Sequence, residues 1–88
     1  MKGYVYILQD QKGRLYVGST EDIKRRLRQH RLGHTQTTRN MTLPKVALIQ
    51  EYDTLEAARL VERRLKRLKR KDYVLKMIAD GHINIEPS

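Results

Sequence analysis

The chain opens with two short stretches in which alternate positions share a character, as in β-strands that present two different faces. The first covers residues 4–9 and the second residues 14–18, on either side of the turn-forming sequence DQKG at 10–13. Gly13 can supply the positive φ that tight turns require. The pattern therefore predicts a β-hairpin, whose first strand would carry Tyr4, Tyr6 and Leu8 on one face and Val5 and Ile7 on the other.

Helical spacing follows the hairpin. The apolar residues Ile23 and Leu27 are four positions apart within a string of Lys and Arg, and this spacing predicts a helix that continues to His30 or Leu32. Gly33 would end this helix. The residues able to cap its N-terminus are Ser19, Thr20 and Asp22.

The second half of the chain predicts one strand and two helices. Residues 45–52, from Lys45 to Tyr52, are apolar and β-prone, and they form the third predicted strand. One helix is expected at about 55–70 and a shorter one at 73–80. The residues that would begin these two helices are Thr54 and Asp72, and Gly81 would close the second.

The order β-β-α-β-α-α describes an α+β fold, with a small three-stranded, mainly antiparallel sheet flanked by helices. The 88 residues suffice for one domain with one modest core, so residues 1–88 are expected to form a single domain. Residues 34–44 lack periodicity, and a loop this long in so small a domain is often functional. Residues 82–88 have no clear pattern.

Charge is the strongest global feature of the composition. The chain has 19 Lys and Arg residues against 10 Asp and Glu, a formal net charge of +9. Such a charge on a small domain indicates a polyanionic partner, because neutralising phosphates releases condensed counterions. Nucleic acid is the leading candidate for this partner. An anionic membrane surface is disfavoured because no predicted helix has a large apolar face opposite its charges. The alternative is a basic protein without such a partner.

Other classes are excluded by what the sequence lacks. It has no cysteine, so neither a disulfide framework nor a cysteine-based zinc site is available. No apolar run approaches the roughly 20 residues of a membrane span, and the N-terminus lacks the apolar core of a signal peptide. We therefore expect a soluble cytoplasmic protein.

The helix predicted at 55–70 contains an isolated acid. Glu62 is the only acid at positions 57–71, among eight Lys or Arg residues. A carboxylate on an apolar row should be partly buried, which is costly unless it is paired or binds a metal. The alternative is a simple ion pair with Arg59 or Lys66. The apolar residues that share its helical row are Leu55, Ala58 and Leu65.

The first helix carries a polar pair, and the hairpin before it is rich in tyrosine. Arg26 and His30 are four residues apart and share one helical face. They either reach one polar site or belong to a solvated basic face that includes Lys24, Arg25 and Arg28. The hairpin holds three of the five tyrosines, Tyr4, Tyr6 and Tyr16.

A phosphodiester nuclease could use all of these groups. Tyrosine hydroxyls can position or deprotonate water, or hydrogen-bond a phosphate. Arginine stabilises charge that develops on a transferring phosphoryl group. One carboxylate suffices for Mg²⁺, which keeps most of its waters and takes further ligands from the substrate phosphate.

The order of these residues resembles that of the GIY-YIG nucleases. YVY at 4–6 and YVG at 16–18 are similar to the paired-strand signature, and an Arg and then a His follow in YVGSTEDIKRRLRQH. LEAARLVERRLKRLKR resembles the family helix in which one Glu precedes a basic stretch. The resemblance covers roughly residues 3–71. Within the family the sequence most resembles the small stand-alone bacterial branch, which is also related to the N-terminal catalytic module of the excision-repair incision subunit. TTRNMTLP at 37–44 resembles the Thr-Arg-containing loop that this branch has before the third strand.

The resemblance implies roles for three hairpin residues. Tyr6 matches the tyrosine proposed as general base toward the attacking water, and Tyr16 matches one that helps hold water or phosphate. Gly18 matches the glycine that lets the backbone pack closely beside the site. Because free tyrosine has a pKa near 10, either nearby cations lower the pKa of Tyr6 or Tyr6 only orients a metal-bound water.

The resemblance also implies roles for three helical residues. Arg26 matches the arginine that stabilises the transition state, and His30 matches a supporting histidine of some members. Glu62 matches the glutamate that binds a single divalent ion, Mg²⁺ or Mn²⁺. Two positions depart from the family pattern: Tyr4 stands where the family name has Gly, and Asn84 is a poor match for an Asn that follows the metal helix in some members.

Chemistry and resemblance together predict a metal-dependent DNA endonuclease that acts in DNA repair or processing. The alternative is a non-catalytic protein of the same fold that binds nucleic acid or recruits a partner. Single-stranded, duplex and branched DNA, and RNA, are all compatible with a basic groove. The residues expected to bind the nucleic acid are Lys24, Arg25, Arg28, Arg39, Lys45 and Lys66.

Overall fold

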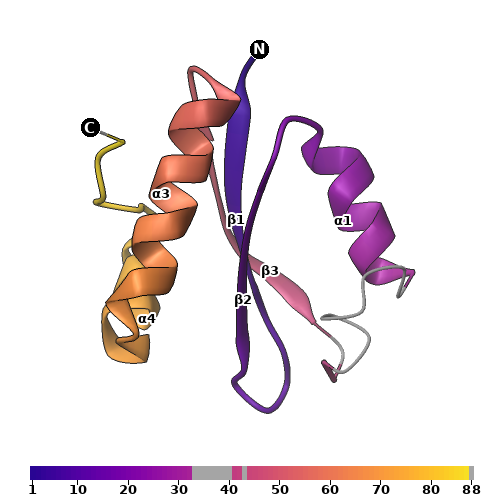
Figure 1. Cartoon of the computed structure of the whole chain (residues 1–88). Helices are drawn as coiled ribbons and strands as arrows, with labels where there is room; N and C mark the ends of the chain where they lie inside the picture. Colours follow the sequence, from indigo (N-terminus) through magenta and orange to yellow (C-terminus); the bar gives the residue numbers. More distant parts are fainter. Residues whose placement is uncertain (33–40, 43, 88) are drawn as a thin grey trace.

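The computed structural model describes residues 1–32, 41–42 and 44–87. Its strands are β1 (Gly3–Gln9), β2 (Leu15–Thr20) and β3 (Lys45–Tyr52), and its helices are α1 (Ile23–Arg31), α3 (Leu55–Leu68) and α4 (Lys71–Asp80). The strands form one sheet in the order β2-β1-β3. Figure 1 shows α1 on one face of this sheet and α3 and α4 on the other. The predicted α+β class and element order are confirmed.

The central strand β1 is antiparallel to both of its neighbours. Its register places Tyr6 opposite Gly18 of β2 and Ile49 of β3. Because side chains alternate along a strand, Tyr6 faces α1, while Val5 and Ile7 face α3. β1 is therefore covered on both faces, as its nearly continuous burial shows.

The hydrophobic core lies between the sheet and the pair α3 and α4. Helical spacing on α3 directs Ala58, Val61 and Leu65 at the sheet, and all three are buried. This core also contains, from the remaining elements, Val5, Ile7, Leu48, Val74, Met77 and Ile83. The position of α3 against β2 is thus fixed by apolar packing.

The hairpin turn is held by a buried carboxylate. Asp10 accepts hydrogen bonds from the backbone N–H groups of Lys12 (3.0 Å), Arg14 (2.7 Å) and Thr42 (3.2 Å), and from the Arg14 guanidinium. Burial opposes ionisation of Asp10, but these donors outweigh it and lower its pKa to about 2. The predicted turn residue Gly13 has φ +82°. Asp10 thus ties the hairpin to the segment before β3.

Three residues were predicted as possible N-caps of the first helix, and one of them occupies that position. Asp22 caps α1 by accepting from the backbone N–H of Arg25 at 3.1 Å. Ser19 and Thr20 do not begin the helix, because β2 extends through both residues. The predicted end at Gly33 lies outside the described residues, as do Arg39 and most of the predicted 34–44 loop.

The boundaries of the last two helices also needed correction. α3 begins after Thr54 as predicted but ends at Leu68, because Lys69 adopts a left-handed conformation with φ 50°. The prediction that Asp72 caps the last helix is wrong. α4 begins at Lys71 with Arg70 at its N-cap, and Asp72 lies in the first turn, where its carboxylate pairs with Arg70. Gly81 closes α4 as predicted.

The segment after α4 belongs to the fold, although the sequence pattern predicted nothing for it. Ile83 is buried in the core. The side-chain amide of Gln50 donates to the Ile83 carbonyl at 3.1 Å and accepts from its backbone N–H at 2.8 Å. These two bonds attach the segment to β3. Among the described residues, no helix combines the length and the apolar character needed to cross a membrane.

Candidate active site

Tyr6 lies at the centre of the face covered by α1. It is 1% exposed, and its ring extends across the backbone of Gly18 in the neighbouring strand. A Cβ added at Gly18 would lie 2.5 Å from the Tyr6 hydroxyl oxygen and 2.6 Å from Cζ. Only glycine leaves room for this ring, which agrees with the close packing expected of Gly18.

Three rings meet on this face. The Tyr6, Tyr16 and His30 centroids are separated by 6.1 Å (the two tyrosines), 5.4 Å (Tyr6 and His30) and 5.0 Å (Tyr16 and His30). The register places Tyr16 next to Tyr6, and the last turn of α1 brings the buried His30 over both. The Tyr6 hydroxyl and His30 Nε2 are hydrogen-bonded at 2.8 Å. The structure thus brings these three predicted residues together.

Burial keeps both partners of this hydrogen bond neutral. It is the main cause that raises the pKa of the Tyr6 phenol, and the neighbouring Tyr16 adds to it. Burial also lowers the pKa of His30, with Arg26 as the second cause. We therefore assign the Tyr6 hydroxyl as donor and the neutral His30 Nε2 as acceptor. Arg26 acts to lower the pKa of Tyr6, but burial has the larger effect.

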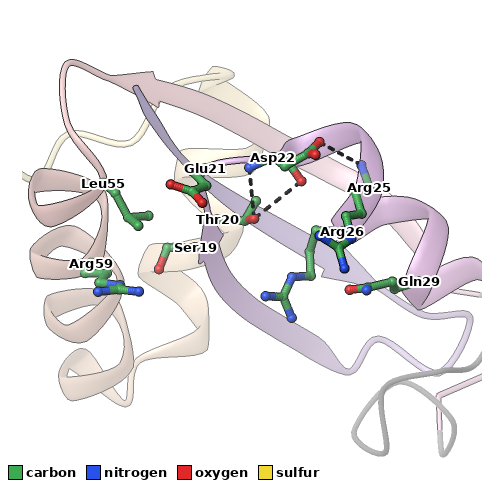
Figure 2. A pocket seen from close by; sticks show the side chains of 9 residues that line it. All are labelled: Ser19, Thr20, Glu21, Asp22, Arg25, Arg26, Gln29, Leu55 and Arg59. Carbon is green, nitrogen blue, oxygen red and sulfur yellow. Dashed lines mark hydrogen bonds between the residues drawn. The ribbon is translucent and has the colours of Figure 1, made fainter. Parts of the chain in front are cut away.

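Arg26 faces the same cluster from α1. It is half-buried, one helical turn before His30, and its charge influences the pKa of both Tyr6 and His30. The guanidinium also lines a pocket of about 260 Å³ between α1 and α3. Figure 2 shows Arg25 and Arg26 on the α1 side of this pocket and Arg59 on the α3 side. Arg26 therefore lies between the ring cluster and this pocket.

Glu62 approaches from the opposite face of the sheet. Its side chain is 19% exposed, and it accepts hydrogen bonds from the Ser19 hydroxyl and, at 2.6 Å, from Lys66 Nζ. Ser19 pairs with Val5 in the sheet, so its side chain faces α3. The charge of Glu62 contributes to the raised pKa of Tyr6 less than burial and Tyr16 do. The expected partial burial is confirmed, and so is the pairing with Lys66.

Ser19 is a site residue that the sequence reasoning missed. It was interpreted as a possible helix cap, whereas it is the β2 contact of Glu62. Strand alternation from Val17 to Ser19 would have placed its hydroxyl on the α3 face. A polar residue on a face that is otherwise packed against a helix is the signal that could have identified it.

The donor atoms fit a metal held by few protein ligands. Glu62 and Ser19 offer hard oxygen atoms at a partly exposed edge, which suits Mg²⁺ or Mn²⁺ with water and phosphate completing the shell. Within the part of the chain that the structure describes, no group of three or more His, Cys, Asp or Glu side chains could enclose a metal ion. A single ion on one carboxylate is therefore the arrangement that fits, with Lys66 in competition for the same carboxylate.

The residues predicted to bind nucleic acid are distributed over several surfaces. Lys24, Arg25 and Arg28 are exposed on α1. Lys45 is exposed on β3, at the sheet edge opposite to the pocket, and Lys66 is paired with Glu62. Of the five members of this set that the structure describes, Arg25 alone lines the pocket beside Arg26. Arg39 lies outside the described residues.

The fold and the candidate site define a small α+β domain with tyrosine, histidine and arginine side chains on one face of its sheet and a carboxylate at the edge strand on the other face. Residues 2–75 match the GIY-YIG catalytic domain, and the chain belongs to that family. The family consists generally of nucleases, so the domain is of a nuclease type whose substrates are nucleic acids.

The chain is similar to several bacterial proteins named UPF0213. A UPF0213 protein of Streptococcus pyogenes is 35% identical over 79 residues, covering 89% of this chain and 86% of that protein. Another from Streptococcus pneumoniae is 37% identical over 70 residues, covering 78% and 71% respectively. The solution NMR structure of a UPF0213 protein from Bacillus halodurans is 29% identical, with a TM-score of 0.59 and coverage of 92% of this chain and 87% of that one.

Proposed function

We propose that this protein is a divalent-metal-dependent endonuclease that hydrolyses phosphodiester bonds of DNA. One observation carries the proposal: the Tyr6 hydroxyl is hydrogen-bonded at 2.8 Å to His30 of α1, one helical turn from Arg26, while Glu62 of α3 contacts the neighbouring edge strand β2 at Ser19. A fixed cation and a carboxylate on two sides of a polar hydroxyl match the needs of phosphoryl transfer. Processing or repair of DNA is the cellular role that we propose for this activity.

The ring cluster suggests how the attacking water loses its proton. Because Tyr6 donates to His30, the lone pairs of its oxygen can accept a hydrogen bond from a water molecule. As the water attacks phosphorus, its proton passes to Tyr6 Oη while the Tyr6 proton passes to His30 Nε2. The bond from phosphorus to the leaving sugar oxygen breaks, and that oxygen takes a proton from solvent. The relay leaves a neutral phenol and an imidazolium, so it requires no phenolate. Tyr6 thus orients the water, and His30 is the final acceptor.

The remaining residues bind the phosphate. Arg26 offers a permanently charged fork to the oxygens on which charge develops, and the Tyr16 hydroxyl can hold one of these oxygens. Glu62, with Ser19 beside it, would hold the metal, which supplies Lewis-acid activation and neutralises phosphate charge. Lys66 has to leave one carboxylate oxygen for such binding.

The ion pair between Glu62 and Lys66 favours a second candidate function. A carboxylate already neutralised by lysine is a structural feature as well as a potential ligand. In that case the protein would bind nucleic acid, or recruit a partner to it, without cutting. The basic α1 surface serves this alternative equally well.

Cleavage assays on labelled single-stranded, duplex and branched DNA, and on RNA, test the proposal with Mg²⁺ or Mn²⁺ against EDTA. We expect metal-dependent cutting by the wild type and a loss of at least about 100-fold in Glu62→Gln, because the charge that holds the metal is gone. Binding of DNA by this variant should be unchanged or tighter.

Two outcomes contradict the nuclease proposal. A Glu62→Gln protein that melts earlier and still cuts at the wild-type rate would show that Glu62 only stabilises the fold. A wild type that binds these substrates and cuts none of them would support the non-catalytic alternative.

A further inference from the structure

The pocket between α1 and α3 is lined by none of the three clustered rings and contains charges that the proposed chemistry does not use. It lies where β2 ends and α1 begins, and Gln29 and Leu55 complete its walls. Figure 2 shows Arg59 entering from α3, opposite to Arg25 and Arg26. Three guanidinium groups from two separate helices therefore share one small space.

Among the residues that the structure describes, these arginines have no acidic partner. None of the ion pairs formed within residues 1–32, 41–42 and 44–87 involves Arg25, Arg26 or Arg59. Arg59 is one helical turn before Glu62, yet the carboxylate pairs with Lys66. Like charges gathered in one cleft repel one another, so an anion between them would be stabilised.

The acids of the pocket do not neutralise it. Asp22 uses its carboxylate to cap α1, accepting from the backbone of Arg25. Glu21 is exposed and forms no ion pair with any described residue. With both acids ionised, the three arginines still give the pocket lining a net positive charge. Glu21 reduces this positive charge and should therefore weaken the binding of an anion.

We propose that Arg59 and Arg25 form a subsite for the phosphate next to the scissile one, in a single strand that passes between α1 and α3. The inference rests on the proposed function, because Arg26 and Glu62 define where the scissile phosphate lies. Arg59 precedes Glu62 by about 4.5 Å along the helix axis, so it reaches the neighbouring unit of the same backbone. Its planar fork, like that of Arg25, suits two phosphate oxygens.

The size of the pocket favours one strand over a duplex. Its 260 Å³ is slightly below the range of about 300–1,000 Å³ that encloses drug-sized ligands. One sugar-phosphate unit fits between the two walls, and an unpaired strand can enter without a second backbone held beside it. The subsite therefore predicts a preference for single-stranded DNA or for the unpaired arm of a branched substrate.

The test measures binding without cleavage. Fluorescence anisotropy follows a labelled oligothymidylate in EDTA over a series of salt concentrations, with the variants Arg59→Gln and Arg25→Gln. Arg67→Gln is the matched control, because Arg67 is also exposed on α3 but does not line the pocket. Arg59→Gln and Arg25→Gln should each weaken binding about tenfold or more. Each should also reduce the slope of log affinity against log salt concentration by about 0.7, the contribution of one phosphate contact to a single strand. Glu21→Gln should bind more tightly than the wild type.

The outcomes separate this subsite from the nuclease proposal. Equal losses in Arg59→Gln and Arg67→Gln would overturn the subsite and leave catalysis at Glu62 unaffected. Duplex binding that depends equally on Arg59 would overturn the preference for one strand. A wild type that never cuts, but whose binding depends on Arg59 and Arg25 and not on Arg67, would remove the nuclease proposal and retain the subsite. No binding at low salt would overturn both.

Discussion

The hydroxyl of Tyr6 lies against the backbone of Gly18, at a distance that no side chain on Gly18 would permit. Glycine is therefore needed here because of space and not because of backbone conformation, since Gly13 and Gly81 are the glycines with positive φ in the described residues. The contact fixes the ring of Tyr6 at the point where it meets His30. Packing in β2 thus determines the geometry of the hydrogen bond in the proposed relay.

Gly18→Ala should damage both stability and activity. The added Cβ would overlap the buried Tyr6 ring, and such overpacking typically costs about 1–3 kcal/mol of unfolding free energy. Thermal melting and cleavage rates would be measured together. Gly81→Ala tests positive φ without such a clash, because nothing lies within 4 Å of its Cβ position. A Gly18→Ala protein with wild-type melting and rate would show that the Tyr6 ring can move freely.

Arg26→Ala should reduce cleavage by about 100-fold or more, as expected for the loss of a transition-state electrostatic contact. Arg28→Ala is the matched control, because Arg28 belongs to the same helix, is exposed, and does not line the pocket. Its effect should be limited to weaker, salt-dependent binding. If the two variants lose activity equally, Arg26 contributes only to general basicity.

Lys66→Met should strengthen metal binding. The substitution keeps much of the length of the side chain but removes the ammonium that occupies one Glu62 oxygen. We expect calorimetric titration with Mn²⁺ to give a several-fold lower Kd, independently of any cleavage. Lys76→Met, on α4, controls for the loss of one positive charge. An unchanged Mn²⁺ affinity would mean that Lys66 does not compete for the carboxylate.

His30 should make the fold less stable in mild acid. Burial, and then Arg26, lowers the pKa of the folded imidazole below the unfolded value of about 6.5. Between the two values the unfolded chain binds more protons, so stability falls as pH drops from about 6.5 toward the lowered pKa, and is constant above about 7. Melting temperatures from pH 5 to 8 would be compared with those of His30→Gln, which should flatten this dependence. An identical pH dependence in the variant would contradict the assignment.

Asp10 should stabilise the protein above about pH 4. Its folded pKa of about 2 lies below the unfolded value of about 3.9, so its contribution is complete above the latter and is lost as pH falls toward 2. Asp10→Asn removes this contribution at neutral pH, and the melting temperature should decrease. The same variant measured near pH 2 should differ little from the wild type. A constant difference across this range would exclude ionisation as the cause.

Periodicity predicted the elements of this fold because each one has a distinct apolar face. β3 and the start of α3 were placed correctly by the apolar run at 45–52 and by Thr54. The prediction that Asp72 caps the last helix failed because several polar residues precede that helix. Local preference does not decide which of them adopts the cap conformation. The prediction of Ser19 as a helix cap failed for a related reason, since serine is common in caps and is also tolerated at strand ends.

The candidate site could be predicted as a set of residues but not as a set of protonation states. The residue order and the family resemblance selected Tyr6, Tyr16, Arg26, His30 and Glu62. The pKa of Tyr6 depends on burial between β2 and α1, which the spacing of residues does not show. The cleft arginine Arg59 was likewise considered only as a partner of Glu62. Its position opposite Arg25 results from two helices that are distant in sequence.

The edge strand β2 separates the proposed proton relay from the carboxylate that we propose as the metal ligand. The relay depends on how α1 packs over the tyrosines, whereas Glu62 depends on the apolar contacts of Val61 and Leu65 behind the sheet. Substitutions in that core can therefore shift the carboxylate while the rings stay in place. Natural variants of such a domain could lose cutting and keep substrate recognition in a single step.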